Sequence, residues 1–183
     1  MSAGHGHVDS HGGNKGVALL ISVLALVLAF SETLGKAAQT TATSTNIEAS
    51  NLWAFFQAKT IRQTVLRTAA EQMDAANPGE AANKLIAKWK ETAERYQSEP
   101  ETNEGRNELA ARAKAAEQKR DRAMSSYHHY EVSSAAVQIA IVLASASIIT
   151  TMPALVWLAG ALGLVGIAFC VIGFWFPAAV HLF

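Results

Sequence analysis

The stretch that decides the fold is "VSSAAVQIAIVLASASIITTMPALVWLAGALGLVGIAFCVIGFWF", residues 132–176. It contains no charged residue, and Pro153 divides it into two apolar runs, residues 132–152 and 154–176. A helix needs about 20 apolar residues to cross the hydrocarbon core of a bilayer. Proline cannot donate a backbone hydrogen bond and disfavours helix at the preceding residue, which indicates a tight turn. The stretch therefore predicts two antiparallel membrane-spanning helices.

A third apolar run, "VALLISVLALVLAF", occupies residues 17–30. It reaches the length of a span only if it continues to Gly35, so we place this span at residues 16–35. A cleaved signal peptide is the alternative, because the run has the length of a signal-peptide core. Only Lys15 precedes the run closely, and no clear small-residue cleavage site follows it. These features favour a retained anchor.

The charges are balanced in number and concentrated in the middle of the chain. The chain has 15 Lys and Arg against 15 Asp and Glu, which argues against a nucleic-acid partner. Every charged residue except Asp9 and Lys15 lies between Glu32 and Glu131. Basic residues near the span ends are Lys36, Lys114, Lys119, Arg120 and Arg122. By the positive-inside rule, residues 36–131 are expected to be cytoplasmic, with the N-terminus on the other side of the membrane.

Residues 36–131 have the spacing of three helices that fold back on each other. The first is expected from about residue 46, with an apolar stripe at Ala54, Ala58, Ile61, Val65, Ala69 and Met73 that Leu52, Phe55, Phe56 and Leu66 widen. The sequence "NPGE" predicts that a second helix starts with Asn77 as its cap. This helix is expected to end at Glu99–Pro100, and a third to begin near Thr102.

No Gly or Pro lies between Arg106 and Met152, so the third helix could continue into the membrane as one helix of about 50 residues. A kink at the interface near His128 is the alternative. The predicted fold is an all-α membrane protein with one N-terminal span, a C-terminal pair of spans, and a long, coiled-coil-like helical insert. Residues 1–15 and 177–183 are expected to be tails, the first of them disordered.

Five consecutive apolar residues, Leu52 to Phe56, interrupt the polar sequence "NIEASNLWAFFQAKTIRQ". Such a block needs more than one contact face. Either a single chain packs on both faces of the helix, or one face meets another copy, where Trp and Phe concentrate. We expect another copy, through Leu52, Trp53, Phe55 and Phe56. A stripe of small residues containing Gly163, Gly166 and Gly173 suits close helix contacts, either between the two C-terminal spans or between copies, and these glycines are also assigned to the oligomer interface.

Four polar residues near the span ends could line a pore or relay protons: Glu32, His128, Glu131 and Gln138. An inert polar collar, with Glu32 paired to Lys36, is the simpler alternative. The tail residues His5, His7 and His11 could bind a transition metal, but their glycine-rich setting favours incidental affinity only. The single cysteine, Cys170, is expected to be a packing residue. No nucleotide loop, nucleophile motif or paired-cysteine site occurs, so neither an enzyme nor a cofactor is expected.

The segments "SETLGKAAQT", "NIEASNLWAFFQAKTIRQT" and "YEVSSAAVQIAIVLASASIIT" resemble the signature segments of a bacterial membrane family catalogued as domain of unknown function four-three-three-seven. The resemblance covers nearly the whole chain except the His-containing tail. It implies a multi-pass protein of the bacterial inner membrane, and it supplies no activity or catalytic residue.

The leading hypothesis is a non-enzymatic, homo-oligomeric membrane protein whose cytoplasmic helices act in assembly or as a scaffold. Its expected partners are the lipid bilayer, further copies of itself and other membrane proteins. The alternatives are an oligomeric channel or transporter component for ions or small solutes, and a metal-binding membrane protein.

Overall fold

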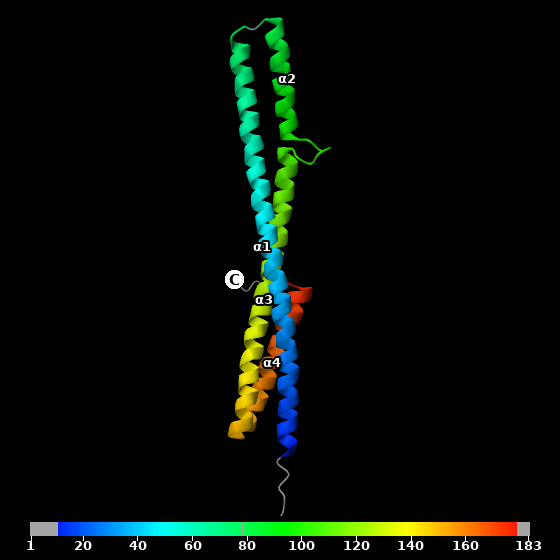
Figure 1. Ribbon diagram of the computed structural model, residues 1–183, viewed down its shortest axis with the longest axis vertical. Helices are drawn as coiled ribbons and strands as arrows, with labels where there is room; N and C mark the ends of the chain where they lie inside the picture. Colours follow the sequence, from blue (N-terminus) through cyan, green and yellow to red (C-terminus); the bar gives the residue numbers. More distant parts are fainter. Residues whose placement is uncertain (1–10, 78, 179–183) are drawn as a thin grey trace, which may run out of the picture. The chain divides into compact units, whose positions relative to one another are not determined.

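The computed structural model describes residues 11–77 and 79–178, with side chains from residue 15 onward. Four helices follow one another: α1 (His11–Ala75), α2 (Glu80–Gln97), α3 (Arg106–Thr150) and α4 (Pro153–Trp175) (Figure 1). No strand occurs in these described residues. The chain divides into two compact units, Met1–Thr40 with Arg122–Phe183 (the terminal unit) and Thr41–Asp121 (the middle unit). The prediction of an all-helical protein is confirmed.

Three helices are long and apolar enough to cross a membrane: α1 through its first part, α3 through its last part, and α4. Each of these helices contains one of the three apolar runs from which spans were predicted, and the bounds of the spans stay a prediction. The turn at Pro153 is confirmed, because α3 ends at Thr150 and Pro153 occupies the first turn of α4. α3 is one helix from Arg106 to Thr150, as the lack of Gly and Pro predicted. α1 starts at His11, inside the tail that was predicted to be disordered.

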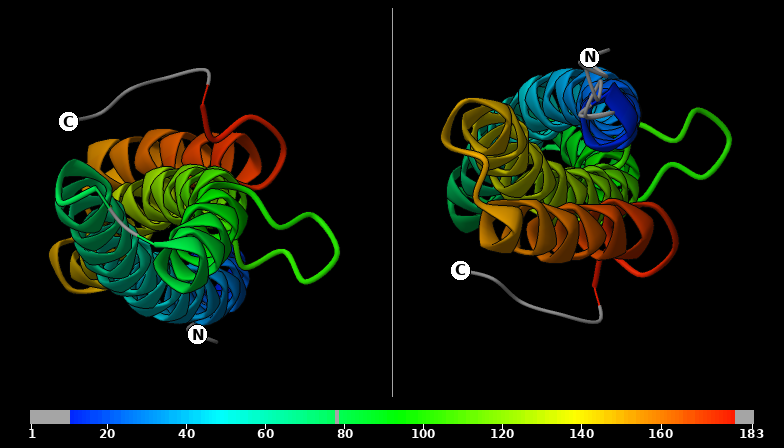
Figure 2. Two further views of the ribbon diagram at one scale, coloured as in Figure 1. Left: turned by 90° about the horizontal axis from the view of Figure 1, so that it is seen from above. Right: turned by 90° about the horizontal axis from the view of Figure 1, so that it is seen from below.

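In the terminal unit, α4 packs against α1 at Gly163 and Leu24 and against α3 at Gly166 and Val137. Figure 2 shows the three helices beside one another in its view from below. The core contains five residues, Leu24, Val137, Ala140, Ala144 and Ala159, all at most 2% exposed. Three of these five are alanines, so the helices approach closely and the buried area per residue is small. Large apolar side chains lie mainly on the outside, where Trp157 is 82% exposed and Ile149 is 85% exposed.

In the middle unit, α2 and the first part of α3 lie one after the other along α1, both antiparallel to it (Figure 1). Lys90 of α2 contacts Asp74 near the end of α1, and Leu109 of α3 packs with Leu52 nearer the middle of α1. The prediction of three helices folded back on each other is therefore wrong in this respect. α2 and α3 run in the same direction, and the connection 98–105 protrudes to one side before α3 resumes that direction (Figure 2).

The buried side of α1 in the middle unit also differs from the predicted stripe. Ala54, Ala58, Ile61 and Val65 are exposed, and Ile61 remains 65% exposed. The side chains that face the chain's own helices advance in steps of four and three and include polar residues; this inner row is Thr45, Ala49, Leu52, Phe56, Lys59, Gln63, Leu66, Ala70 and Met73. The predicted stripe included Leu52, Phe56, Leu66 and Met73 of this row. It did not include Thr45, Lys59 and Gln63, because only apolar residues were counted.

Two helix starts were also misplaced. Asn77 does not cap α2, because Gly79 is the N-cap and Asn77 has φ 51°, a left-handed conformation typical of the residue that ends a helix such as α1. α3 begins at Arg106 instead of near Thr102, since Asn103 also has a positive φ of 56°. Asparagine tolerates this conformation better than most residues, which suits both positions to turns.

Candidate functional site

A polar groove of about 430 Å³ lies between α1 and α3 in the terminal unit. Glu32, Lys36, Glu131 and Gln138 line it together with Tyr130. The structure thus brings together three of the four residues predicted to line a pore or relay protons. The fourth, His128, does not line the groove, but its Nδ1 lies 3.7 Å from Oε2 of Glu131, which does.

Two polar residues of the groove, Glu32 and Gln138, are exposed and only loosely paired. Nε2 of Gln138 donates a hydrogen bond to Oε1 of Glu32 at 3.3 Å, and both side chains are exposed. Two carboxylates and one ammonium group therefore line the groove, an arrangement that favours a cation or a zwitterionic headgroup over an anion. The predicted pairing of Glu32 with Lys36 is not among the ion pairs of the described residues.

A buried hydrogen-bond network that begins at Ser31, which also lines the groove, links all three helices of the terminal unit. The hydroxyl oxygens of Ser31 and Ser133 are 2.9 Å apart, and Ser133 donates to the carbonyl oxygen of Gly166 at 2.7 Å. Both serines are fully buried. An unpaired hydroxyl group in such a buried place would be destabilising. These hydrogen bonds therefore fix the rotation of α1, α3 and α4 relative to one another.

The predicted interface glycines mediate contacts within the chain. A Cβ at Gly163 would lie 2.6 Å from Leu24 Cδ2, at Gly166 2.5 Å from Val137 Cγ2, and at Gly173 2.9 Å from His129 Cβ. All three positions are buried. The structure therefore supports the close contact of α4 with α1 and α3. A contact of these glycines with another copy stays a prediction.

His129, the neighbour of His128, points toward α4. It is 1% exposed, its Nδ1 lies 2.6 Å from the carbonyl oxygen of Ser125, and its ring lies beside Phe169. At that distance Nδ1 carries the hydrogen and donates it. Nε2 has no hydrogen-bond partner. His129 therefore packs α3 against α4 and does not belong to the groove.

In the middle unit, most of the block Leu52–Phe56 packs within the chain. Leu52 is 7% exposed against α3, and Trp53 Nε1 donates to Glu117 Oε1 at 2.9 Å. Trp53 and Phe56 pack edge to face with centroids 5.4 Å apart. Phe55, at 37% exposed, is the large residue of the block that remains accessible. A role of Leu52, Trp53 and Phe56 between copies stays a prediction, with little free surface to support it.

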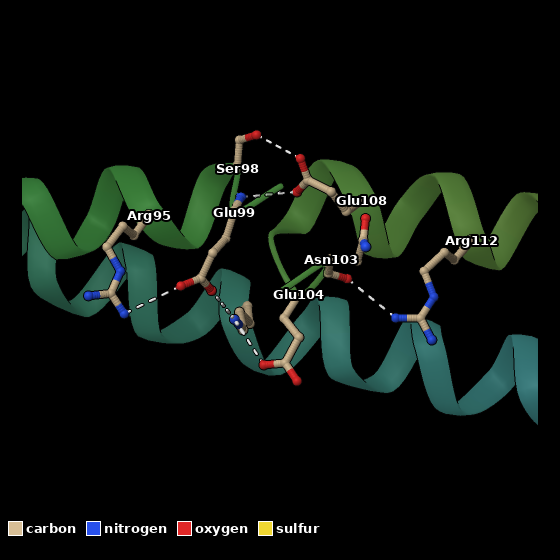
Figure 3. Close-up of polar contacts among 8 residues, drawn as sticks. Arg95, Ser98, Glu99, Asn103, Glu104, Glu108 and Arg112 are labelled. Carbon is tan, nitrogen blue, oxygen red and sulfur yellow. Dashed lines mark hydrogen bonds and ion pairs between the residues drawn. The ribbon is translucent and has the colours of Figure 1, made fainter. Parts of the chain in front are cut away.

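Next to this block, a polar junction joins α1 to the end of α2 and the start of α3. Nζ of Lys59 lies 3.5 Å from Oε2 of Glu99 and 3.9 Å from Oε2 of Glu104. Figure 3 shows Glu99 and Glu104 with dashed lines at their carboxylates. The same ammonium group lies 5.4 Å from the ring centroids of Phe55 and Tyr96. Lys59 is only 5% exposed, so two carboxylates and two aromatic faces replace its water.

A second cation of the junction, Arg106, begins α3. Its guanidinium group donates to Gln63 Oε1 and to Gln97 Oε1, and it lies 4.9 Å from the ring centroid of Phe56. Gln63 Nε2 in turn donates to the carbonyl oxygen of Ala93 at 2.8 Å. None of Lys59, Gln63 and Arg106 was expected from the sequence to be a site residue. The inner row advances in steps of three and four residues even where its members are polar. Applying this spacing to polar residues as well would have predicted that Lys59 and Gln63 face the chain's own helices.

The outer side of α1 in the middle unit carries a second row, opposite the inner row: Ile47, Asn51, Ala54, Ala58, Ile61 and Val65. All six residues of this outer row are exposed, including Ile47 at 55%, Ile61 at 65% and Val65 at 61%. Among the described residues of the middle unit, the other large exposed apolar side chains are Phe55, beside the row, and Leu85 on α2. The apolar surface of this unit is therefore concentrated on one helix face.

The proposed metal site cannot be placed. His5 and His7 lie outside the described residues, and so does the side chain of His11. Within the part of the chain that the structure describes, no group of three His, Cys, Asp or Glu side chains is close enough to hold a metal ion.

These features define an all-helical protein with three long apolar helices, a polar groove between two of them, and a charged helical unit with one apolar outer face. The chain belongs to the family described as "Domain of unknown function (DUF4337)", whose model matches residues 13–176. No curated protein and no solved structure showed a significant match.

Proposed function

We propose that this chain is a three-span protein of the bacterial inner membrane, and that its cytoplasmic helices, residues 36–131, hold copies together as a non-enzymatic scaffold. The apolar exterior of the terminal unit supports the membrane location. Trp157, Leu164 and Leu19 are between 67% and 82% exposed there, a surface that a soluble monomer rarely presents.

The observation that carries the scaffold proposal is the outer row of α1. The inner row is covered by the chain's own α2 and α3, whereas the outer row exposes Ile47, Ile61 and Val65 to solvent. The spacing of the outer row in steps of four and three is typical of helices that pack side by side in coiled coils. Oligomerisation would cover this row without rearranging the chain, which explains why an exposed face of α1 carries Ile47, Ile61 and Val65.

The test is the mass of the full chain in detergent micelles or nanodiscs. We expect more than one 19.5 kDa chain per particle, and a shift to single chains when Ile61 and Val65 are both replaced by Asp. Leu85→Asp is the matched control, because Leu85 is also apolar and exposed but lies on α2. A single-chain mass for the unaltered protein would contradict the proposal.

An ion or small-solute pathway is the second candidate, favoured by the groove that collects Glu32, Glu131 and Gln138. In an oligomer, several such grooves could face a common axis and line a path for cations. The test is cation flux into liposomes with the full chain and with Glu32→Gln, using Glu71→Gln in the middle unit as the control. Absence of flux, or flux that Glu32→Gln leaves unchanged, would exclude this role for the groove.

A further inference from the structure

The outer row of α1 has the geometry of a coiled-coil contact with a polar residue at one defined layer. Ile47, Ala54 and Ile61 repeat at intervals of seven residues, and so do Asn51, Ala58 and Val65, offset by four. In heptad notation the first set occupies d positions and the second set a positions. Asn51 is therefore the polar residue within an otherwise apolar contact.

The charges beside the outer row do not oppose a second copy of the same helix. With two helices parallel and in register, residues five apart face each other across the contact: Ser50 with the partner's Phe55, Gln57 with the partner's Arg62, and Thr64 with the partner's Ala69. No two like charges meet. At the a layer, Asn51 meets the partner's Asn51, and the two amides can donate to and accept from each other.

The antiparallel alternative is less favourable. It would pair Glu48 with the partner's Arg62 twice, at exposed positions where ion pairs contribute little. It would also place Asn51 opposite the partner's Ile61 twice, leaving two amides without a partner in an apolar contact. The loss of two hydrogen-bonded amides outweighs two exposed ion pairs, so the sequence of the row selects the parallel arrangement.

The helix is already formed on the chain's own α2 and α3, so association does not have to pay for folding it. A bilayer is a poor alternative occupant, because the charged residues Glu48 and Arg62 lie directly beside the row and Glu71 lies just beyond its end. We propose that two copies associate through the outer rows of α1, parallel and in register, with Asn51 against the partner's Asn51. This inference rests on the proposed function and specifies its interface, partner and stoichiometry.

The test uses thiol crosslinking of the full chain in nanodiscs, in a Cys170→Ala background that leaves no other cysteine. Ile61→Cys should crosslink to itself with a short thiol-specific reagent, because the partner's residue 61 lies directly across a parallel contact. In the antiparallel arrangement the two residues are on the order of 15 Å apart along the axis, and only a mixture of Ile61→Cys with Asn51→Cys should react. Lys88→Cys, exposed on α2, is the control and should not crosslink. Circular dichroism checks that each variant keeps its helix content.

The mass of the same samples separates this inference from the proposed function. A mass of two chains with Ile61→Cys self-crosslinking supports both. A mass of several chains overturns the inference, and leaves oligomerisation supported, if Ile61→Cys does not crosslink to itself or if only the mixture with Asn51→Cys reacts. A mass of three or more chains together with the Ile61→Cys self-crosslink overturns the proposed stoichiometry of two. A single-chain mass without crosslinks overturns both.

Asn51→Val tests independently whether Asn51 lies in the contact between copies. A buried Asn at an a position favours two strands, and an apolar replacement with β-branched neighbours relaxes this preference. We expect Asn51→Val to increase the fraction of higher oligomers several-fold while Ile61→Cys in the same chain still crosslinks. An unchanged oligomer distribution would show that Asn51 does not lie in the contact.

Discussion

Nζ of Lys59 lies 3.5 Å from Oε2 of Glu99 although Lys59 is only 5% exposed. A lysine in this position is stabilised only while its counter-charges remain. Glu99 provides the nearer one and also pairs with Arg95 at 3.4 Å. The pair therefore ties the middle of α1 to the point where α2 ends, and the two residues should respond very differently to substitution.

Replacing the anion should cost more than replacing the cation. Glu99→Gln leaves a nearly buried ammonium group with only Glu104 at 3.9 Å, and we expect a loss of about 1–3 kcal/mol in unfolding free energy. Lys59→Met removes the charge and keeps an unbranched side chain of similar length, so its effect should stay within about 1 kcal/mol.

Thermal unfolding of the full chain in detergent, followed by circular dichroism, measures both effects. Lys84→Met is the control, because its pair with Glu80 is exposed and should contribute almost nothing. If Lys59→Met lowered the unfolding midpoint as much as Glu99→Gln, the ion pair itself would be a net source of stability. That result would contradict the prediction that loss of the anion costs more than loss of the cation.

Gly105 permits the close return of the chain from the connection 98–105 to α3. A Cβ there would collide with the backbone nitrogen of Glu99 and would lie 2.7 Å from Cα of Ser98. These are backbone atoms that cannot rotate away, so we expect Gly105→Ala to lower the unfolding free energy by about 1–3 kcal/mol.

The control for this prediction is Gly160→Ala in α4, where a Cβ would meet nothing within 4 Å. It should be neutral or stabilising by up to about 1 kcal/mol, because alanine is the better helix former. Equal effects of the two substitutions on the unfolding midpoint would show that crowding at Gly105 is not limiting.

The junction also predicts a pH dependence. The pKa of Glu108 lies below its usual range, chiefly because Ser98 donates a hydrogen bond to Oε1 at 2.7 Å, with a further bond from the backbone nitrogen of Glu99 to Oε2. A carboxyl group with a lowered folded-state pKa stabilises the folded state fully above its unfolded-state pKa of about 4.3, and this contribution disappears as the pH falls through the folded-state pKa.

The unfolding midpoint of Glu108→Gln should therefore lie below that of the unaltered chain at pH 6, and the difference should shrink once the pH falls below about 4. Glu91→Gln, an exposed substitution on α2, corrects for the general effect of acid. A difference that stays constant from pH 6 to pH 3 would show that the charge of Glu108 plays no part.

The three long apolar helices and the unbroken α3 could be predicted from the sequence because both depend on local properties: apolar length, and the absence of Gly and Pro between Arg106 and Met152. The junction could not. Lys59 is buried only because Glu99 and Glu104, some 40 residues away in sequence, neutralise it. A helix with apolar residues on two sides gives no local indication of which side its own chain will cover.

The same limit applies to the glycines of α4. Their small-residue stripe indicated a close helix contact, but not whether the contact lies within the chain. The hydroxyl of Ser133, bonded to the carbonyl oxygen of Gly166, settles the within-chain contact for that position.

Gly166 is therefore expected to be sensitive to a single added methyl group. A Cβ there would lie 2.5 Å from Cγ2 of Val137 and 3.2 Å from the carbonyl oxygen of Ser133. Valine is β-branched and stiff at χ1, so it cannot turn aside easily, and α4 must move outward from α3. That movement would weaken the bond from Ser133, and we expect Gly166→Ala to lower the unfolding free energy by about 1–3 kcal/mol relative to Gly160→Ala on the same helix. The double variant Gly166→Ala with Val137→Ala should recover part of this loss, because the second substitution removes the methyl group that the first one meets. Additive losses in the unfolding midpoint would instead mean that the two side chains do not touch.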